Sequence, residues 1–194
     1  MWYAPRMRPV PPPFAEPLPS LQTARLLLRA LERTDAAAVH EAVAVAEVAQ
    51  QTLAIPHPYP AGAADGFIAD AAAAWQAGTA ATWAVVHRAE DRLVGMISLR
   101  FVWPHRRAEL GYWIARPAWG NGYATEAARA VIAHAFDALG LHRVEARRFD
   151  GNAASGRVLA KAGLRDEGCL RGALWRDGVA RDVIISGILA GDPR

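Results

Sequence analysis

Hydrophobic residues recur along this chain in two rhythms, and the longer rhythm predicts helices. The clearest helical stretch has an apolar stripe at three- and four-residue steps, formed by Ala128, Val131, Ile132, Ala135, Phe136 and Leu139. Gly140 follows it and is a natural helix end. Similar patterns predict helices over residues 36–49, 64–78 and 153–162, and Thr34 or Asp35 is suited to cap the first of these.

Shorter apolar or alternating runs predict strands over residues 25–31, 82–87, 93–101, 108–115 and 142–148. The pair Asp177–Gly178 is a strong turn signal, so residues 169–175 and 180–189 form a closing hairpin. A strand, a helix and a strand follow one another between residues 108 and 148, which indicates a parallel crossover. The fold class is therefore α+β, a mixed and mostly antiparallel sheet with helices on both faces.

The first twenty residues differ from the rest, because they hold more than half of the 13 prolines. Proline lacks an N–H and fixes φ, so residues 1–20 should form an extended arm. We expect this arm to dock on this or a neighbouring subunit, and a floppy tail is the alternative. Residues 21–194 form a single domain. Three prolines also make residues 52–60 a loop between two helices.

Composition narrows the class of protein. The chain has 194 residues, 53% of them hydrophobic, and a formal charge of +3 with scattered arginines, which argues against a nucleic-acid partner. The one cysteine, Cys169, excludes an internal disulfide. No apolar run approaches the roughly 18 residues of a membrane span, and no signal peptide is evident. We therefore expect a cytoplasmic protein without a membrane partner, and the histidines show no metal-ligand spacing, so no metal is expected.

The stretch "WGNGYATEA" places Gly120 and Gly122 directly before a helix. A nucleotide-hydrolysing loop would have lysine and a hydroxyl residue where Tyr123 and Ala124 stand, and a dinucleotide fingerprint would have a third small residue at Thr125. What remains suits a pyrophosphate held by backbone N–H groups at a helix start.

The same stretch resembles the acyl-CoA-binding motif of the GNAT N-acetyltransferases. "RLLLRAL" is similar to the first strand of that family, "AELGYWI" to its fourth, and "NAASGRVLAKAGL" to its Asn-led helix. "IPHPYP" and the tail "EGCLRGALWRDGVARDVIISGIL" resemble the RimJ/RimL branch, which acetylates N-termini of ribosomal proteins. The resemblance covers roughly residues 21–189. It implies a sheet splayed between strands 4 and 5, acetyl-CoA as co-substrate, and an amine acceptor; a homodimer is compatible with it.

The resemblance also implies site residues. The coenzyme-binding candidates are Trp113, Ile114, Arg116, Trp119, Gly120, Asn121, Gly122, Tyr123, Ala124, Thr125, Asn152, Arg157 and Lys161. The catalytic candidates are Ser155 as acid, Glu109 as the remaining acidic residue, and Asn152. The acceptor groove is assigned to His57, Tyr59 and Tyr112.

Two positions depart from the family pattern. Leu159 stands where many members have a tyrosine proton donor, and Leu174 matches a glutamate base.

An α-amine, with a pKa of about 7.7–8.0, is easier to deprotonate than a lysine side chain, with a pKa of about 10.4. We therefore expect the acceptor to be a protein N-terminus. The sequence has no Gly-x-Ser-x-Gly nucleophile elbow, so the acetyl group is expected to move directly to the amine in a ternary complex. A small amine such as a polyamine, amino acid or aminoglycoside is the alternative acceptor, and a non-catalytic acyl-CoA sensor is the alternative outside the enzymes.

Overall fold

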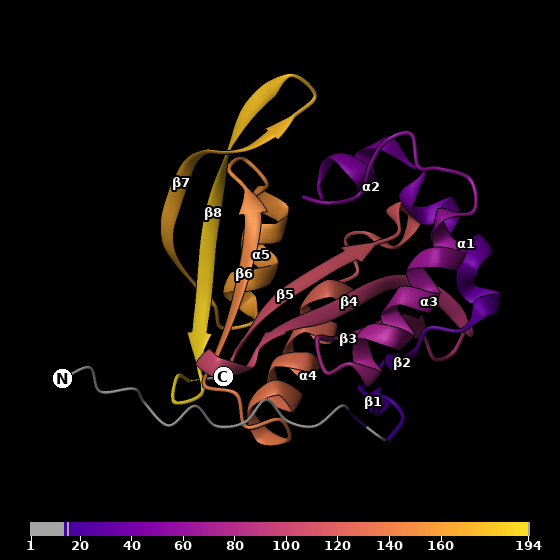
Figure 1. Cartoon of the computed structure of the whole chain (residues 1–194), viewed down its shortest axis with the longest axis horizontal. Helices are drawn as coiled ribbons and strands as arrows, with labels where there is room; N and C mark the ends of the chain where they lie inside the picture. The colour runs from indigo at the N-terminus through magenta and orange to yellow at the C-terminus, as the bar shows by residue number, and fades with distance from the viewer. Residues whose placement is uncertain (1–13, 15, 194) are drawn as a thin grey trace.

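One twisted eight-stranded sheet organises the molecule (Figure 1). The computed structural model describes Phe14 and residues 16–193. The sheet has the order β1-β2-β3-β4-β5-β6-β8-β7. Its strands are β1 (Leu21–Gln22), β2 (Leu26–Ala30), β3 (Ala80–His87), β4 (Arg92–Val102), β5 (Arg107–Ile114), β6 (Arg143–Phe149), β7 (Arg165–Arg176) and β8 (Val179–Leu189). The α+β class and the mixed sheet are as predicted.

Strands β5 and β6 are the parallel neighbours, and every other pair is antiparallel. The crossover between them is the helix α4 (Tyr123–Asp137), so the predicted parallel connection is confirmed. Their pairing covers only Arg107–Leu110 against Arg143–Ala146. Beyond Leu110 the two strands separate, as Figure 1 shows. Because β5 and β6 correspond to the fourth and fifth strands of the family, this is the splay that the resemblance implied.

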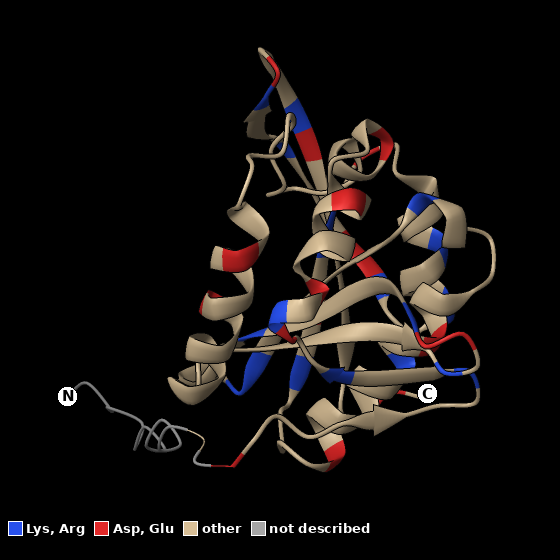
Figure 2. Ribbon diagram, turned by 90° about the vertical axis from the view of Figure 1, so that its right-hand side faces the viewer, with Lys and Arg blue, Asp and Glu red and all other residues tan. Residues whose placement is uncertain are grey.

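Helices cover both faces of the sheet. On one side lie α1 (Ala36–Val43), α2 (Ala46–Gln50) and α3 (Ala63–Gln76), each of which contributes buried residues to a cluster around Trp113. On the other side lie α4 and α5 (Ala153–Lys161), packed on the larger core of the sheet. Acidic and basic residues are interspersed along the strands and helices (Figure 2).

The single helix predicted over residues 36–49 is wrong. The chain has two helices there, because Val45 is extended, with φ −71° and ψ 121°, and interrupts the helical run. A β-branched residue has reduced helix propensity. The break lets Val43 and Val48, on either side of it, both become buried in the Trp113 cluster. The short strand β1 was not predicted.

The described part of the predicted arm packs on the domain. The ring of Phe14 stacks on Trp75 with centroids 4.0 Å apart. The indole N–H groups of Trp75 and Trp83 donate to the carbonyls of Glu16 and Pro19, each at 2.8 Å. Residues 1–13 of the arm lie outside the described residues.

Candidate active site

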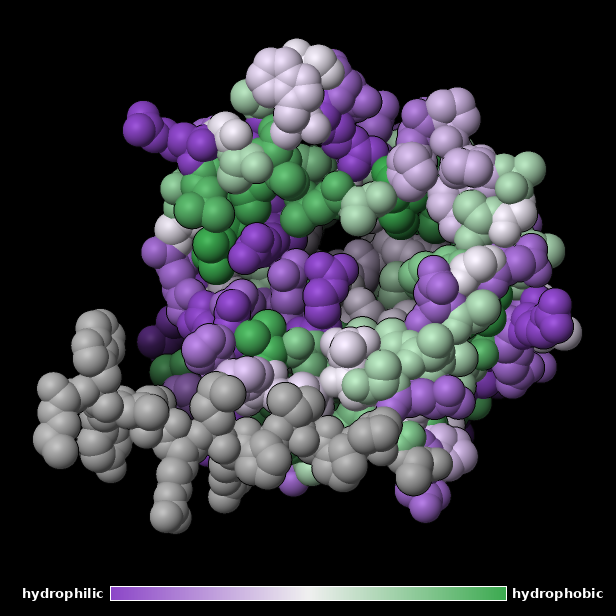
Figure 3. Space-filling model, in the orientation of Figure 1, coloured by the Kyte–Doolittle hydropathy of each residue, from purple (hydrophilic) through white to green (hydrophobic). Residues whose placement is uncertain are grey.

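A cavity of about 640 Å³ lies where β5 and β6 separate. Its walls are the end of β5, the glycine loop that leads into α4, the first turns of α5, and residues Val48, Gln51 and Thr52 at the end of α2. In the space-filling view the middle of the molecule is hollowed between the hairpin side and the helical side (Figure 3). The splay of the sheet therefore makes the cavity.

The two glycines of the loop adopt a left-handed backbone. Gly120 and Gly122 have φ of +80° and +79°, a left-handed conformation that other residues adopt only with strain. The first helical bond of α4 runs from the Glu126 N–H to the Gly122 carbonyl. The amides of Tyr123, Ala124 and Thr125 precede that bond, so the helix itself provides no acceptor for them. These three residues line the cavity, so their amide N–H groups are available to bind an anion there.

The open edge of β5 forms another wall. The Ala115 N–H donates to Val94 of β4 at 2.8 Å, so by alternation the backbone of Trp113 also points to β4. The backbone groups of Tyr112 and Ile114 point instead to the side that β6 has left. The Ile114 carbonyl accepts the indole N–H of Trp119 at 2.6 Å. The Ile114 N–H faces the cavity side of the strand.

Helix α5 brings Asn152 and Ser155 to the cavity. Asn152 is the N-cap of α5, and its Oδ1 accepts the Ser155 N–H at 3.0 Å. The Ser155 Oγ lies 2.8 Å from the Tyr112 Oη across the splay. Burial raises the pKa of Tyr112 to about 12, although its hydrogen bond with Ser155 and the charge of Arg148 both act to lower it. The phenol is therefore neutral at physiological pH.

Two of the three predicted cations line the cavity. Arg157 and Lys161 belong to its wall, one turn apart on α5. Arg129 of α4 donates to the Lys161 carbonyl at 2.7 and 3.0 Å and so holds the end of α5 beside α4. Arg116 is not part of the wall; its guanidinium lies 4.9 Å from the ring centroid of Trp119.

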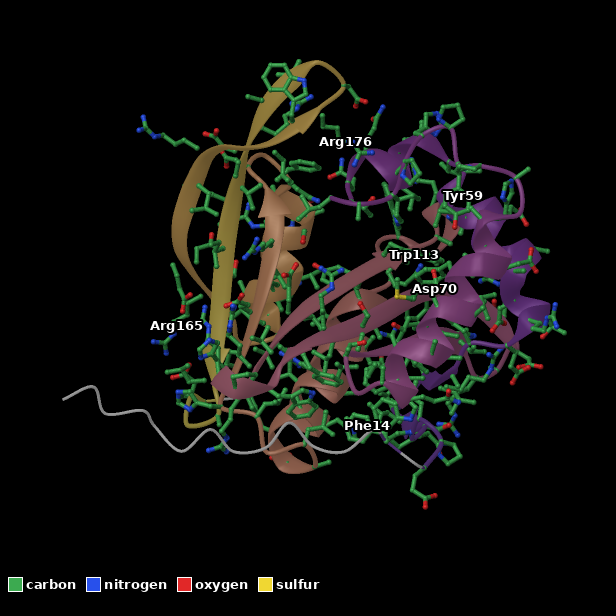
Figure 4. All side chains as sticks on the ribbon, viewed as in Figure 1. Phe14, Tyr59, Asp70, Trp113, Arg165 and Arg176 are labelled. Carbon is green, nitrogen blue, oxygen red and sulfur yellow. The ribbon has the colours of Figure 1, made fainter. Side chains whose placement is uncertain are left out.

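The end of α2 forms the wall of the cavity that faces the β7–β8 hairpin. The residues there were not assigned to the site from the sequence. Arg176, at the tip of the β7–β8 hairpin, donates to the carbonyls of Ala49, Thr52 and Ile55 at 3.1, 2.5 and 2.8 Å. Figure 4 shows Arg176 between the hairpin and α2. Asn152 adds a bond from its Nδ2 to the Gln51 carbonyl at 3.3 Å. The two halves of the splayed sheet are thus joined again over the cavity.

Other predicted residues lie away from this wall. Glu109 shares the sheet face of Trp113, opposite to Tyr112, and its Oε2 lies 3.9 Å from the Nε of Arg147. Tyr59 is partly buried against the Trp113 cluster, with its ring centroid 5.5 Å from that of His40. His57 is exposed, and the Asn121 amide donates to the carbonyls of Ala118 and Trp119 within the loop.

The structure places the two leucines that depart from the family pattern, Leu159 and Leu174, in different surroundings. Leu159 is 1% exposed in the main core, so its side chain lies among apolar neighbours. Leu174 lies in β7, where it pairs with Arg181 of β8. Within residues 14 and 16–193, no three His, Cys, Asp or Glu side chains are grouped to hold a metal ion. Over the same residues, no helix has the length and apolarity to cross a membrane.

The splayed sheet, the left-handed glycine loop and the adjoining helix start define an acyl-CoA-dependent acyltransferase fold. A model of the GNAT acetyltransferase domain matches residues 25–165, and the chain belongs to this family. It is 34% identical over 172 residues to the N-acetyltransferase YoaA of Bacillus subtilis, covering 88% of this chain and 97% of that protein. The chain is an acetyl-CoA-dependent N-acetyltransferase.

Two further comparisons concern ribosomal proteins. The ribosomal-protein-serine acetyltransferase of Escherichia coli is 33% identical over 95 residues, which span 48% of this chain and 53% of that protein. Mycobacterium smegmatis RimJ, solved with a CoA disulfide, superposes with a TM-score of 0.78 at 25% identity and covers 89% of this chain and 88% of that one. The chain is thus similar to RimJ/RimL-type enzymes in sequence and in structure.

Proposed function

We propose that this enzyme acetylates the α-amine of a protein N-terminus by direct attack on acetyl-CoA. One observation carries the choice of acceptor. Among the described residues, the ionisable side chains that line the cavity are Tyr112, Tyr123, Arg157 and Lys161, two phenols and two cations. Such a wall neither attracts a polycation nor offers a carboxylate to deprotonate a strongly basic amine.

The free-energy difference between acceptors is large. Deprotonating a lysine at pH 7 costs about 4.6 kcal/mol, against about 1–1.4 kcal/mol for an α-amine. The difference of about 3 kcal/mol corresponds to roughly two orders of magnitude in the population of reactive amine. A cavity lined in this way suits the less basic amine. The names of the ribosomal-protein relatives support the same class of acceptor.

The assigned roles follow from the positions of the residues. The amides at the start of α4 bind the pyrophosphate, with Arg157 and Lys161 available to the outer phosphate. The Ile114 N–H, on the open edge of β5, stabilises the oxyanion that forms when the amine attacks the thioester carbonyl. The N–C bond forms and the C–S bond breaks. Sulfur leaves with the electron pair and takes a hydrogen bond from Ser155. The proton that the attacking nitrogen gives up passes to water, because no carboxylate lines the cavity among the described residues, and the thiolate recovers a proton from solvent through the Ser155 hydroxyl.

The test compares acceptors of known chemistry by the release of CoA thiol. One peptide carries a free N-terminal serine and no lysine; its partner has a blocked N-terminus and one internal lysine; spermidine is the third acceptor. We expect kcat/KM to be at least about tenfold higher for the free N-terminus, with mass spectrometry locating the acetyl group on the α-nitrogen. Preferred turnover of spermidine or of the blocked lysine peptide would contradict the proposal.

A further inference from the structure

We propose that Tyr112 is a positioning residue for Ser155: it donates its phenolic hydrogen to the serine oxygen and leaves the serine hydrogen for the departing sulfur. This inference rests on the proposed reaction. The two residues come from different elements, since Tyr112 lies on β5 and Ser155 on α5. Both line the cavity at the splay.

The serine is held at two points. Its N–H donates to Asn152 Oδ1 at 3.0 Å, which fixes the first turn of α5, and its Oγ lies 2.8 Å from the Tyr112 Oη. Within the described part of the chain this is the one hydrogen bond of the Ser155 side chain. A serine hydroxyl has one hydrogen and can accept two. If Tyr112 is the donor, the serine hydrogen stays available to the cavity.

The chemistry of the pair favours that direction. A phenol is a stronger acid than an aliphatic alcohol, so it is the better donor, and the alcohol oxygen is the better acceptor. Arg148 of β6 strengthens the preference, because its positive charge draws electron density from the phenol. Burial keeps the phenol protonated, so its hydrogen remains in place over the working pH range.

The position of Arg148 is built into the fold. Its side chain is only 11% exposed, and its Nη2 donates to Asp166 Oδ2 at 2.8 Å. Its Nε is buried without a hydrogen-bond partner among the described residues. The guanidinium lies against Gly156 of α5, where an added Cβ would be 3.2 Å from both Cζ and Nε. Glycine inside a helix costs about 0.5–1 kcal/mol relative to alanine. Gly156 is therefore explained by the cation beside it.

A double-mutant cycle tests the inference with the acceptor that the wild type turns over best. We expect Tyr112→Phe to lower kcat by about tenfold, the value of one oriented hydrogen bond, with little change in the KM for acetyl-CoA. Ser155→Ala should lower kcat further. The double variant should be no slower than Ser155→Ala alone, because Tyr112 acts only through that serine.

A second variant reaches the same network from α5. Gly156→Ala would place a Cβ 3.2 Å from the Arg148 guanidinium and so shift it by a few tenths of an ångström. We expect a lower kcat when this is the only substitution, but no added loss in the Ser155→Ala background. The Gly156→Ala experiment tests the same network even if the Tyr112→Phe variant does not fold.

Three results would overturn the role of Tyr112 while leaving the proposed function intact: full kcat in Tyr112→Phe, a change confined to KM, or losses that multiply in the double variant. A wild type that releases no CoA with any N-terminal peptide would instead overturn the proposed function, and this inference with it.

Discussion

The indole N–H of Trp119 donates to the Ile114 carbonyl at 2.6 Å, and this bond joins the glycine loop to the open end of β5. Trp119 directly precedes Gly120, so the bond fixes the point from which the loop turns. It also occupies the carbonyl on the β5 edge that β6 has left. The Ile114 N–H on the same edge stays available to a ligand.

Because this bond preorganises the loop, Trp119→Phe should weaken CoA binding. The phenyl ring keeps much of the packing but loses the donor, and one hydrogen bond corresponds to about a three- to tenfold change in Kd. Isothermal titration calorimetry with CoA measures it directly. Tighter binding by Trp119→Phe would contradict the prediction, since it would mean that the indole competes with the coenzyme for the Ile114 carbonyl.

The glycine loop allows a test with a matched control. Gly122 and Gly140 precede and follow α4, both have positive φ, at +79° and +61°, and an added Cβ at either would meet no atom closer than 3.7 Å. Alanine at each should cost about 1–2 kcal/mol of folding free energy through backbone strain. Of these two glycines, Gly122 lines the cavity and Gly140 does not.

We therefore expect Gly122→Ala to lose CoA affinity and stability, and Gly140→Ala to lose stability alone. Urea unfolding and calorimetric titration separate the two effects. Equal CoA affinity in both variants would show that the loop is a turn without a role in binding.

The cations of α5 make a prediction about the outer phosphate of the coenzyme. Arg157→Gln and Lys161→Gln should each weaken CoA binding by about tenfold, the effect of one charge-assisted contact. The loss should vanish with 3′-dephospho-CoA if the outer phosphate is the partner. Arg33→Gln, exposed and away from the cavity wall, is the control. Arg116→Gln should have a smaller effect, because Arg116 lies on Trp119 outside that wall. An equal loss in all four variants would point to net charge rather than to specific contacts.

Local pattern was sufficient for much of this site. The glycine loop, the strand that ends at Ile114 and the Asn-capped helix are each encoded within about ten consecutive residues, where periodicity and capping act. Alternation along "AELGYWI" also placed Glu109 and Tyr112 on opposite faces of the sheet. Alternation did not decide which of these residues borders the cavity, since Trp113 shares the face of Glu109 and still lines the wall.

The remaining features depend on contacts between distant parts of the chain. Arg176 meets the end of α2 across 121 to 127 residues, and Tyr112 meets Ser155 across 43. No local propensity encodes such pairs. The helix break at Val45 is similar, because burial of Val48 against the Trp113 cluster overrides a continuous helical pattern. These contacts and the helix break are therefore set by tertiary packing and could not be predicted from hydrophobic periodicity.

Glu126, in the first turn of α4, links this helix to the start of β2. Its carboxylate accepts hydrogen bonds from Thr23 Oγ1 at 2.6 Å, from the Arg25 N–H at 2.9 Å and from the Arg25 Nε at 2.8 Å. Burial alone would raise its pKa, but these bonds and the charge of Arg25 outweigh burial and lower it from the ordinary 4.5. The ionised carboxylate therefore stabilises the folded state.

Since the pKa is lower in the folded protein, this stabilisation is fully present above about pH 4.5 and is lost as pH falls through the folded value. Glu126→Gln should reduce the free energy of unfolding by about 1–2 kcal/mol at pH 7, and the gap to the wild type should narrow as the pH is lowered below 4.5. Glu47→Gln is the matched control, a glutamate in the first turn of α2 whose side chain makes no ion pair among the described residues. Urea unfolding at several pH values measures both. A gap that stays constant with pH would show that Glu126 acts through packing rather than through its charge.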